Sequence, residues 1–556
     1  MRMKTLRLLT LALFAVSTAA AQGNRGFGYE DEYSPTVYLI SVNQPDMRSD
    51  CPCPAKEAAE LNRLAAEAAI LDYRETHRPG FQQVEKPQFI FTTKNNKFSL
   101  ALGGYINMRA GYDLEGIVNN IDFVPADIPM TSNYANGEKL MMDATTSRVF
   151  LKAITNTRAL GRVVVFIDGD FRGGRENSYV PRLRSAYVSM LGFTLGRDVT
   201  TFCDLLAGPN TIDFRGPNAY NLHFATMIRY EVPFANNHMK FGFAAEMPSV
   251  SGTYGDNMVA VPARMPDFPV FLQVAWGPER RNHIRASAVF RNMYMHNIEK
   301  NYTLSKFGWG VQGSGHITIA RAFELFFNGV YGEGISRYIQ DLAGQGLDFT
   351  PIPNSPTHLQ TMPMYGWQVA GQINFSPRVF ISGGYSTVEV CHKNGYYSPN
   401  EYRRGQYIFG NIFCRVTPRC KLAAEYLYGT RTMPTMLPGA AFFLGMSYPP
   451  AREMIAAGLG VALASDYNPG SSPSGNMKTV VSLACIRMRM TPAEAINAAT
   501  LNSAYAMGLS RDFGSITVGK VANFFLTKPM PSVAFFPYAY TTPVIRRVFL
   551  RGQEVA

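Results

Sequence analysis

The stretch KFSLALGGYINMRAGYD, residues 97–113, alternates between two kinds of side chain. Phe98, Leu100, Leu102, Ile106, Met108 and Tyr112 would lie on one face of an extended chain. Ser99, Tyr105, Asn107, Arg109 and Asp113 would lie on the other. A period of two predicts a β-strand whose two faces meet different surroundings.

The same alternation returns in HMKFGFAAEM (238–247), HIRASAVFRN (283–292) and FGWGVQGSGHITI (307–319). Segments of about ten residues with one apolar and one polar face are typical of strands between lipid and a water-filled lumen. A soluble β-sandwich also alternates, but its charged face points outward and its core face is seldom so rich in aromatic residues at strand ends. We therefore predict a mainly β chain with a membrane β-barrel over residues 87–431.

Two predicted turns fit such a barrel. NFSPRVFIS (374–382) and RVTPRCKLA (415–423) share a Ser/Thr-Pro-Arg centre between strands, and proline presets the φ angle of a type I turn. The longer Gly-, Asn- and Pro-rich stretches 116–140 and 341–362 are expected to be loops at the opposite rim. About 20 residues per strand and connection give a barrel of roughly 16 strands, wide enough for an aqueous channel.

Composition and charge narrow the function. Only 17% of residues are charged, while Phe and Tyr are plentiful, and the formal net charge is +12. A basic excess suits small anions, an acidic membrane surface or nucleic acid. No Lys/Arg run or interleaved basic-aromatic motif supports nucleic acid, so we expect no nucleic-acid partner.

The first residues resemble an export signal. Arg2, Lys4 and Arg7 precede an apolar stretch that ends in Ala19-Ala20-Ala21, a small-residue cleavage site. The apolar core is too short to span a bilayer as a helix. We therefore expect residues 1–21 to be a signal peptide that is removed after export.

Residues 22–86 are then expected in the periplasm. Within them, residues 54–76 carry a helical pattern in which Leu61, Leu64, Ala68 and Leu71 follow 3–4–3 spacing. The pattern fits a short coiled coil, which would make the protein an oligomer. It fits an amphipathic helix packed on its own chain equally well.

Three segments of the barrel region resemble the DcaP-like group of trimeric outer-membrane porins. They are RLRSAYVSMLGFTLGRDVTTFCDLLAGPNTIDFRGP (182–217), NGVYGEGISRYIQDL (328–342) and GQYIFGNIFCRVTPRCKLAAEYLYGTR (405–431). The resemblance covers residues 50–431. It implies a passive homotrimeric channel, embedded in outer-membrane lipid, that passes small anionic solutes and needs no cofactor.

Four arginines on the predicted lumen face could carry anion selectivity. Arg109, Arg184, Arg285 and Arg291 would place fixed cations along the path of the solute. Each could instead be the partner of a loop carboxylate. The sequence leaves both roles open.

The alternation stops after EYLYGTR (425–431), so the predicted barrel lacks its last strand. Residues 432–556 instead predict a short helix over Arg452–Gly458, a buried strand over Val461–Ala464 and a helix over Lys478–Met488. A longer helix with an N-terminal capping box formed by Thr491 and Glu494 follows, and then a β-rich tail. This order is typical of an α/β barrel, in which functional residues follow strand ends.

The segments LPGAAFFLG (437–445), ASDYNPGSSPSGNM (464–477) and TPAEAINAATLNSAYAMGL (491–509) closely resemble the C-terminal part of imidazolonepropionase, in the amidohydrolase superfamily. The resemblance implies that Asp466 is a metal ligand that aids the attacking water. It implies that Asn468, Gly470 and Ser471 contact the substrate. A complete enzyme would hold zinc or iron, convert 4-imidazolone-5-propanoate to N-formimidoyl-glutamate in histidine catabolism, and be cytoplasmic.

The expected metal site is incomplete in this chain. The superfamily takes several histidine ligands from earlier strands, yet all eight histidines lie at or before His392. We therefore expect an incomplete α/β (TIM-barrel) fragment joined to a porin, without catalytic activity. The alternatives are a hydrolase completed by another chain and a binding module that uses the barrel as its anchor.

Overall fold

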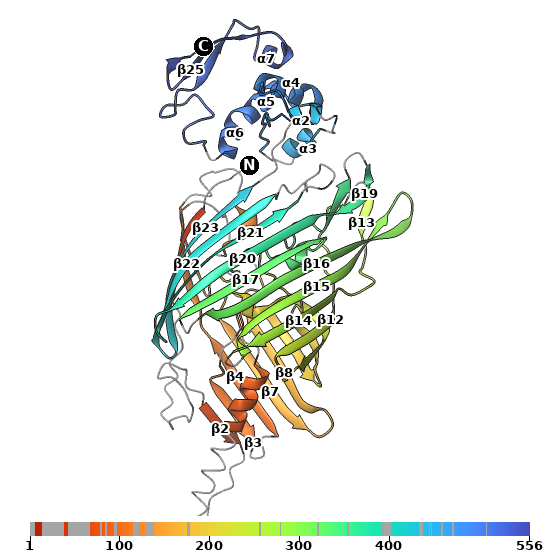
Figure 1. Cartoon of the computed structure of the whole chain (residues 1–556), viewed down its shortest axis with the longest axis vertical. Coiled ribbons are helices and arrows are strands. Elements are labelled where there is room, and N and C mark those ends of the chain that lie inside the picture. The colour runs from red at the N-terminus through yellow and green to blue at the C-terminus, as the bar shows by residue number, and fades with distance from the viewer. Residues whose placement is uncertain are drawn as a thin grey trace, which may run out of the picture.

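The computed structural model describes residues 6–13, 38–42, 67–432 and 438–555, with short gaps inside the two longer ranges. Long antiparallel strands fill most of the chain as far as Thr432, and short helices with a small sheet follow from Pro438. Figure 1 shows the strands as a tall curved wall, with the helices gathered beyond one rim. The predicted fold class, a β-barrel followed by an α/β segment, is confirmed.

The alternation in residues 97–113 places apolar side chains outside the wall. On β4 (Phe98–Tyr105) and β5 (Met108–Asp113), Phe98 and Met108 are exposed, whereas Ser99 and Arg109 are buried. In a membrane barrel the outward row faces lipid and the inward row faces the lumen. The face assignment made from the sequence is therefore confirmed.

Neighbouring strands of the wall pair antiparallel around one large sheet. β4 pairs with β7 and β5 pairs with β6, so these short strands are consecutive halves of two long ones. The wall continues through β6 (Lys139–Asp143), β7 (Arg148–Thr157), β8 (Gly161–Asp170), β9 (Arg182–Met190), β10 (Phe193–Val199), β11 (Phe224–Phe234), β12 (Met239–Glu246), β14 (Phe268–Trp276), β15 (Asn282–Asn297), β16 (Tyr302–Ile319), β17 (Phe323–Glu333), β20 (Pro363–Asn374), β21 (Val379–Val390), β22 (Arg404–Thr417) and β23 (Cys420–Thr432).

The connections differ in length at the two rims. Short turns join β7 to β8, β14 to β15 and β16 to β17 at one end, here called the short-turn rim. The two predicted proline turns are hairpins at this rim, between β20 and β21 and between β22 and β23. The other end, the long-loop rim, carries the small strands β13 (Met258–Ala260), β18 (Phe349–Ile352) and β19 (Ser355–Thr361). Because adjacent strands run in opposite directions, β23 ends at the long-loop rim.

Two long connections fold into the lumen. The first inner segment, residues 200–223, contains the 3-10 turn η3 (Leu205–Ala207), and the second, residues 334–348, contains η5 (Ser336–Tyr338). Phe202 and Leu342 are fully buried in one apolar cluster with inward residues of the wall. The stretch 341–362 was expected to be a loop at the rim. It instead begins inside the barrel, because its apolar residues Leu342 and Leu347 are buried there.

A short helix packs on the wall near the short-turn rim. Residues 67–76 are helical, and Tyr73 and Ala69 pack against β4 and β3 (Phe89–Thr93). Arg162 pairs with Asp72 and Glu75 across this contact. The described helix thus lies against its own chain, whereas Leu61 and Leu64 lie outside the described residues. Within the described part of the chain, no helix has the length and apolar character needed to cross a membrane.

Two strands come from the N-terminal region. β2 (Tyr38–Val42) pairs in parallel with β3. β1 (Leu6–Leu13) lies between β23 and β5 and is antiparallel to both. The segment expected to be removed after export thus occupies the place of the missing last strand.

The C-terminal segment forms a small core of its own. Residues from α4 and α5 bury Val480, Ala484 and Ala495. The capping box of Thr491 and Glu494 is confirmed. The helices are α2 (Pro438–Phe443), α3 (Ala451–Ala456), α4 (Met477–Arg487), α5 (Pro492–Ala499), α6 (Leu501–Ala506) and α7 (Phe535–Tyr538), and the strands are β24 (Phe524–Thr527), β25 (Ile545–Leu550) and β26 (Gln553–Glu554).

Two expectations for this segment were wrong. Val461, Ala462 and Leu463 are buried, but the stretch 461–464 forms no strand beyond a single bridge residue at Leu463, because the described residues place no neighbouring strand beside it. The predicted long helix after Thr491 is broken into α5 and α6 at Thr500, whose φ and ψ of −121° and −83° are not helical.

The orientation of the wall predicts where charge is tolerated. Ile228 lies mid-strand on β11 and is 57% exposed, whereas Phe234, on the same face, ends that strand at 39% exposed. We expect Ile228→Arg to lower the free energy of unfolding by about 2–4 kcal/mol and Phe234→Arg by about 0–1 kcal/mol, because the cost of a charge depends on depth in the bilayer. Urea titration of protein refolded in lipid vesicles measures both. Equal costs would contradict the lipid-facing assignment.

Candidate functional site

The first inner segment is held across the lumen by side chains from many strands. Glu425 on β23 accepts hydrogen bonds from the backbone N–H groups of Ile212 and Asp213, at 3.0 and 2.7 Å. On the opposite side, Asp204 accepts from Ser314 on β16 at 2.7 Å and lies 2.8 Å from Nε2 of His283 on β15. Hydrogen bonds on both sides hold this segment across the lumen, where it forms a partition within the barrel.

A cavity of about 1030 Å³ opens between this partition and the short-turn rim; we call it the vestibule. Leu205, Gly208 and Thr211 of the inner segment form its roof, and turn residues such as Pro377 and Pro418 form its edge. The cavity therefore lies on the path that a solute would take through the barrel.

The vestibule is strongly basic. Glu324 is the acidic residue among its lining residues, and this carboxylate accepts from Asn374 at 2.8 Å and lies 2.8 Å from Nε2 of His316. The lining includes five basic side chains: Lys86, Arg281, Arg415, Arg419 and Lys421. Among the residues that the structure describes, Arg281 and Arg415 make no ion pair. Their guanidinium groups are available to an anion.

Three of the four predicted lumen arginines are instead bound to carboxylates. Arg109 lies 3.1 Å from Asp122 and 2.8 Å from Asp143. Arg291 pairs with Asp348 of the second inner segment at 3.1 Å and lies 3.5 Å from Asp267. These contacts match the second role left open by the sequence, that of partner to a carboxylate, and they neutralise buried charge.

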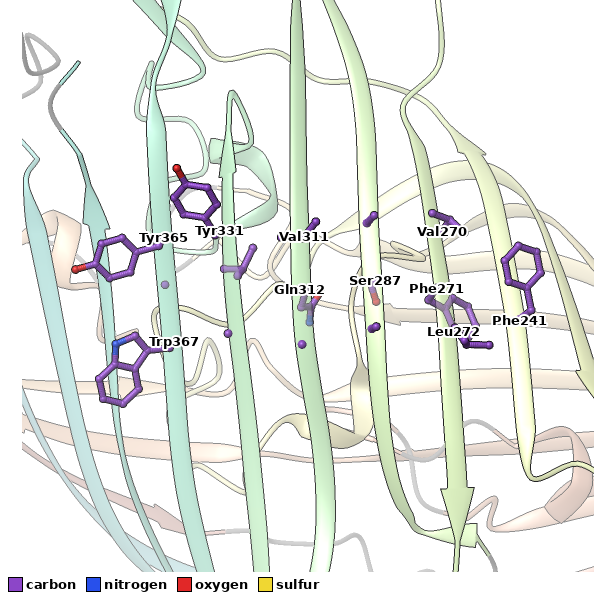
Figure 2. A pocket seen from close by; sticks show the side chains of 16 residues that line it. Phe241, Val270, Phe271, Leu272, Ser287, Val311, Gln312, Tyr331, Tyr365 and Trp367 are labelled. Atoms are coloured by element: carbon purple, nitrogen blue, oxygen red, sulfur yellow. The ribbon is translucent and has the colours of Figure 1, made fainter. Parts of the chain in front are cut away.

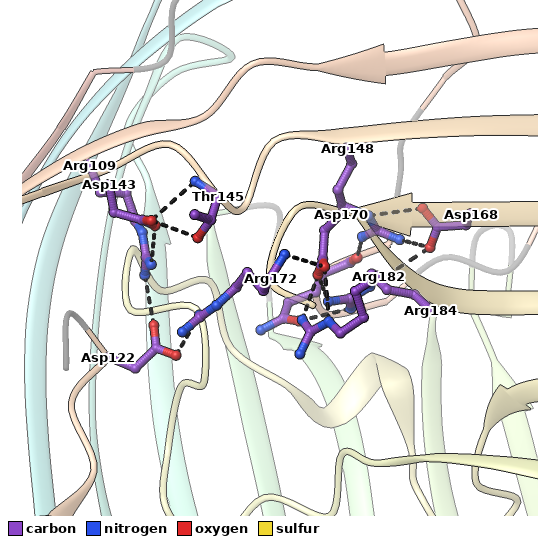
Figure 3. Close-up of polar contacts among 11 residues, drawn as sticks. Arg109, Asp122, Asp143, Thr145, Arg148, Asp168, Asp170, Arg172, Arg182 and Arg184 are labelled. Atoms are coloured by element: carbon purple, nitrogen blue, oxygen red, sulfur yellow. Dashed lines mark hydrogen bonds and ion pairs between the residues drawn. The ribbon is translucent and has the colours of Figure 1, made fainter. Parts of the chain in front are cut away.

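Arg184 belongs to a larger charged network on β7–β9. It lies 3.2 Å from Asp170 and 3.8 Å from Asp168, and Arg182 also binds Asp170, at 2.6 Å. Figure 3 shows this group beside the one around Arg109, with basic and acidic side chains alternating in both. The members drawn and labelled are Arg109, Asp122, Asp143, Thr145, Arg148, Asp168, Asp170, Arg172, Arg182 and Arg184.

Arg285 differs from the other three. No carboxylate pairs with it among the described residues; its guanidinium lies 3.6 Å from the ring centre of Phe271 and donates to the Thr201 carbonyl. It also donates to Ser287 at 3.1 Å. Since it is 8% exposed and holds the first inner segment, its charge is only partly available to a solute.

The sequence analysis missed Arg281 and Arg415, although a signal was present. Arg415 follows the inward row of β22, which includes Tyr407, Asn411 and Phe413. Arg281 directly precedes β15 at the short-turn rim, where the alternation ends. Extending the alternation of β22 by one step would have placed Arg415 in the lumen.

A second hollow, of about 770 Å³, lies along β12–β20, and Figure 2 shows the side chains around it. Outward residues such as Leu272, Val311 and Trp367 contribute much of its lining, and no side chain covers Gly313. These exposed apolar residues place the hollow largely on the lipid-facing side of the wall, and we assign it no role in transport.

The predicted catalytic loop lies in the C-terminal segment. Asp466 is half-buried with a φ of 51°, and the Asn468 side chain donates to the Asp466 carbonyl at 2.6 Å. The Asn468 backbone N–H donates to the Ser472 carbonyl at 3.0 Å, which closes the loop. Gly470 and Ser471 lie outside the described residues.

The residues around this loop do not fit a catalytic divalent metal. Within the described ranges, no three His, Cys, Asp or Glu side chains come together as a ligand group. Glu494, at the start of α5, has a structural role: hydrogen bonds from Arg452 and from the Thr491 backbone lower the pKa of Glu494 to about 2. Asp466 alone cannot supply the three protein ligands of a catalytic site.

Comparison with known protein families separates the chain into two parts. The DcaP outer membrane protein family matches residues 83–263, and the amidohydrolase family matches residues 389–555. The crystal structure of the outer-membrane channel DcaP of Acinetobacter baumannii superposes with a TM-score of 0.53 at 19% identity, covering 60% of this chain and 92% of that one. This structural similarity supports the barrel fold.

The C-terminal part has relatives of high identity. Imidazolonepropionases of Christiangramia forsetii and Flavobacterium johnsoniae are each 60% identical over 131 residues, which is 24% of this chain and 32% of each relative. The chain thus spans about a third of the length of the curated relatives it matches. It combines a DcaP-like porin domain of the bacterial outer membrane with an imidazolonepropionase-like amidohydrolase segment.

Proposed function

We propose that the barrel is a channel for small anionic solutes, and the basic vestibule is the observation that carries this proposal. Among its described lining residues, five basic side chains face a single carboxylate that is already hydrogen-bonded. Fixed cations that line a narrow passage raise the local concentration of anions and exclude cations.

The side chains of the lumen then have two roles. Arg281 and Arg415 attract the solute into the vestibule, where the first inner segment narrows the path. Arg109, Arg184 and Arg291 hold inner carboxylates and keep the lumen in shape, and Arg285 anchors the first inner segment. In this proposal, anion selectivity depends chiefly on Arg281 and Arg415, because their charges are not engaged in ion pairs among the described residues.

The assembly is proposed to be a homotrimer in outer-membrane lipid. The outward rows of β11, β14 and β16 expose residues such as Ile228, Leu272 and Phe307, which suit contact with lipid or with another copy. The similarity to the DcaP family supports this arrangement.

For the C-terminal segment we propose no independent catalysis. The alternative is a metal-dependent hydrolase of a cyclic amide, and the 60% identity to imidazolonepropionases favours it. Amidohydrolases use metal ions, however, and the described residues around Asp466 do not form such a site. Asp466, Asn468, Gly470 and Ser471 would act only if another chain supplied the missing two thirds of the enzyme.

Anion selectivity should depend on the vestibule arginines. We expect the double substitution Arg281→Gln and Arg415→Gln to lower the anion-to-cation permeability ratio at least roughly fivefold, because each charge about 4 Å from the solute contributes about 1 kcal/mol in water. Reversal potentials across planar bilayers in a salt gradient measure the ratio. The matched control is Arg158→Gln, an exposed residue in the β7–β8 turn that does not line the vestibule. Cation preference of the unaltered channel, or equal effects of both variants, would refute the proposal.

Metal analysis tests the C-terminal segment. We expect purified full-length protein to contain no stoichiometric zinc or iron and to leave 4-imidazolone-5-propanoate unchanged, because the described residues bring no group of His, Cys, Asp or Glu ligands together. Elemental mass spectrometry and the absorbance of the substrate report the two quantities. One metal ion per chain that is lost in Asp466→Asn but kept in Asp512→Asn would establish the hydrolase alternative.

A further inference from the structure

The wall of the barrel has a place for one more strand between β23 and β5. β1 occupies it, and its residues Leu6–Leu13 are in register with Gly429–Leu422 of β23. On its other side, Leu8–Leu13 are in register with Asp113–Met108 of β5. Both pairings are antiparallel, so β1 is bonded along both of its edges.

The directions of the strands show why this place cannot simply close. β5 and β23 are both antiparallel to β1, so they run in the same direction as each other. Apart from the short parallel pair of β2 with β3, the other described pairings of this sheet, such as β22 with β23 and β5 with β6, are antiparallel. Direct contact of β23 with β5 would be a parallel pairing that breaks this pattern, so the gap requires a strand of the opposite direction.

The gap is also limited in height. β3 already pairs with Ser99–Leu102 of β4, toward the short-turn rim on the same edge. Leu13, the last residue of β1, lies opposite Met108, and Leu8 lies opposite Asp113. β1 therefore completes the upper part of this edge, and residues 103–107 lie between the stretch paired with β3 and the stretch paired with β1.

We propose that Leu6–Leu13 is the closing strand of the folded barrel, so that the N-terminal segment remains part of the protein. Removal after Ala21 would leave the facing edges of β5 and β23 unpaired at membrane depth. In hydrocarbon each unsatisfied backbone N–H or C=O costs several kcal/mol. The same segment can direct export first and then pair with β5 and β23.

Disulfide cross-linking between introduced cysteines can test the register of β1 against β23 and β5 directly. Leu9 is opposite Tyr426 on β23 and opposite Tyr112 on β5. Opposite residues in antiparallel strands have Cα atoms about 4.5–5.5 Å apart, which suits a disulfide. In a full-length chain whose native cysteines are replaced by serine, we expect Leu9→Cys to cross-link with Tyr426→Cys and, separately, with Tyr112→Cys. The control is Leu9→Cys with Leu427→Cys, which is one residue out of register and fully buried on the other face.

Two further measurements keep the test decisive if the cysteine-free chain folds poorly. The intact mass of the folded, heat-modifiable species from outer membranes should include residues 1–21. Refolding of a chain that starts at residue 22 should yield roughly tenfold less of that species, because its edges stay unpaired. A folded barrel that lacks residues 1–21, or cross-linking to Leu427→Cys as efficient as to Tyr426→Cys, would overturn the proposal.

Discussion

A strand that crosses hydrocarbon must find partners for every backbone N–H and C=O group within the sheet. Most of the architecture follows from this requirement. It explains why β15 and β16 pair along almost their whole length, and why the helical segment lies beyond a rim rather than within the wall. It also makes the edges of β5 and β23 depend on β1, because the described residues after β23 supply no further strand of the wall.

Inside the wall a second requirement applies, since a buried charge needs a partner. The inner segments meet it by bringing carboxylates to the arginines of the strands, as Asp348 does for Arg291. Removing one partner of such a buried pair typically costs 3–5 kcal/mol. In the proposed channel, the charges that remain for a solute are those at the short-turn rim, such as Arg281 and Arg415, which make no ion pair among the described residues. Structural and permeation charges are thus separated by depth.

The sequence predicted the barrel because a period of two is a local signal that survives in every strand. It predicted the faces of residues 97–113 and the proline turns for the same reason. The inner segments could not be predicted, because their position depends on distant partners such as Glu425 for Asp213. The roles of the arginines were likewise undecided, since the alternation shows that Arg109 points inward but not that Asp143 meets it there. Val461–Ala464 failed as a strand because the prediction presumed neighbouring strands, and the described residues place none beside this stretch.

The end of β23 at the long-loop rim has a topological consequence. In outer-membrane barrels the long loops face the exterior and the short turns face the periplasm. A barrel inserted in this sense would display everything after Thr432 on the cell surface, much as a passenger domain is displayed by its translocator. The helices α2–α7 would then meet external proteases and antibodies, far from any metabolite of the cytosol.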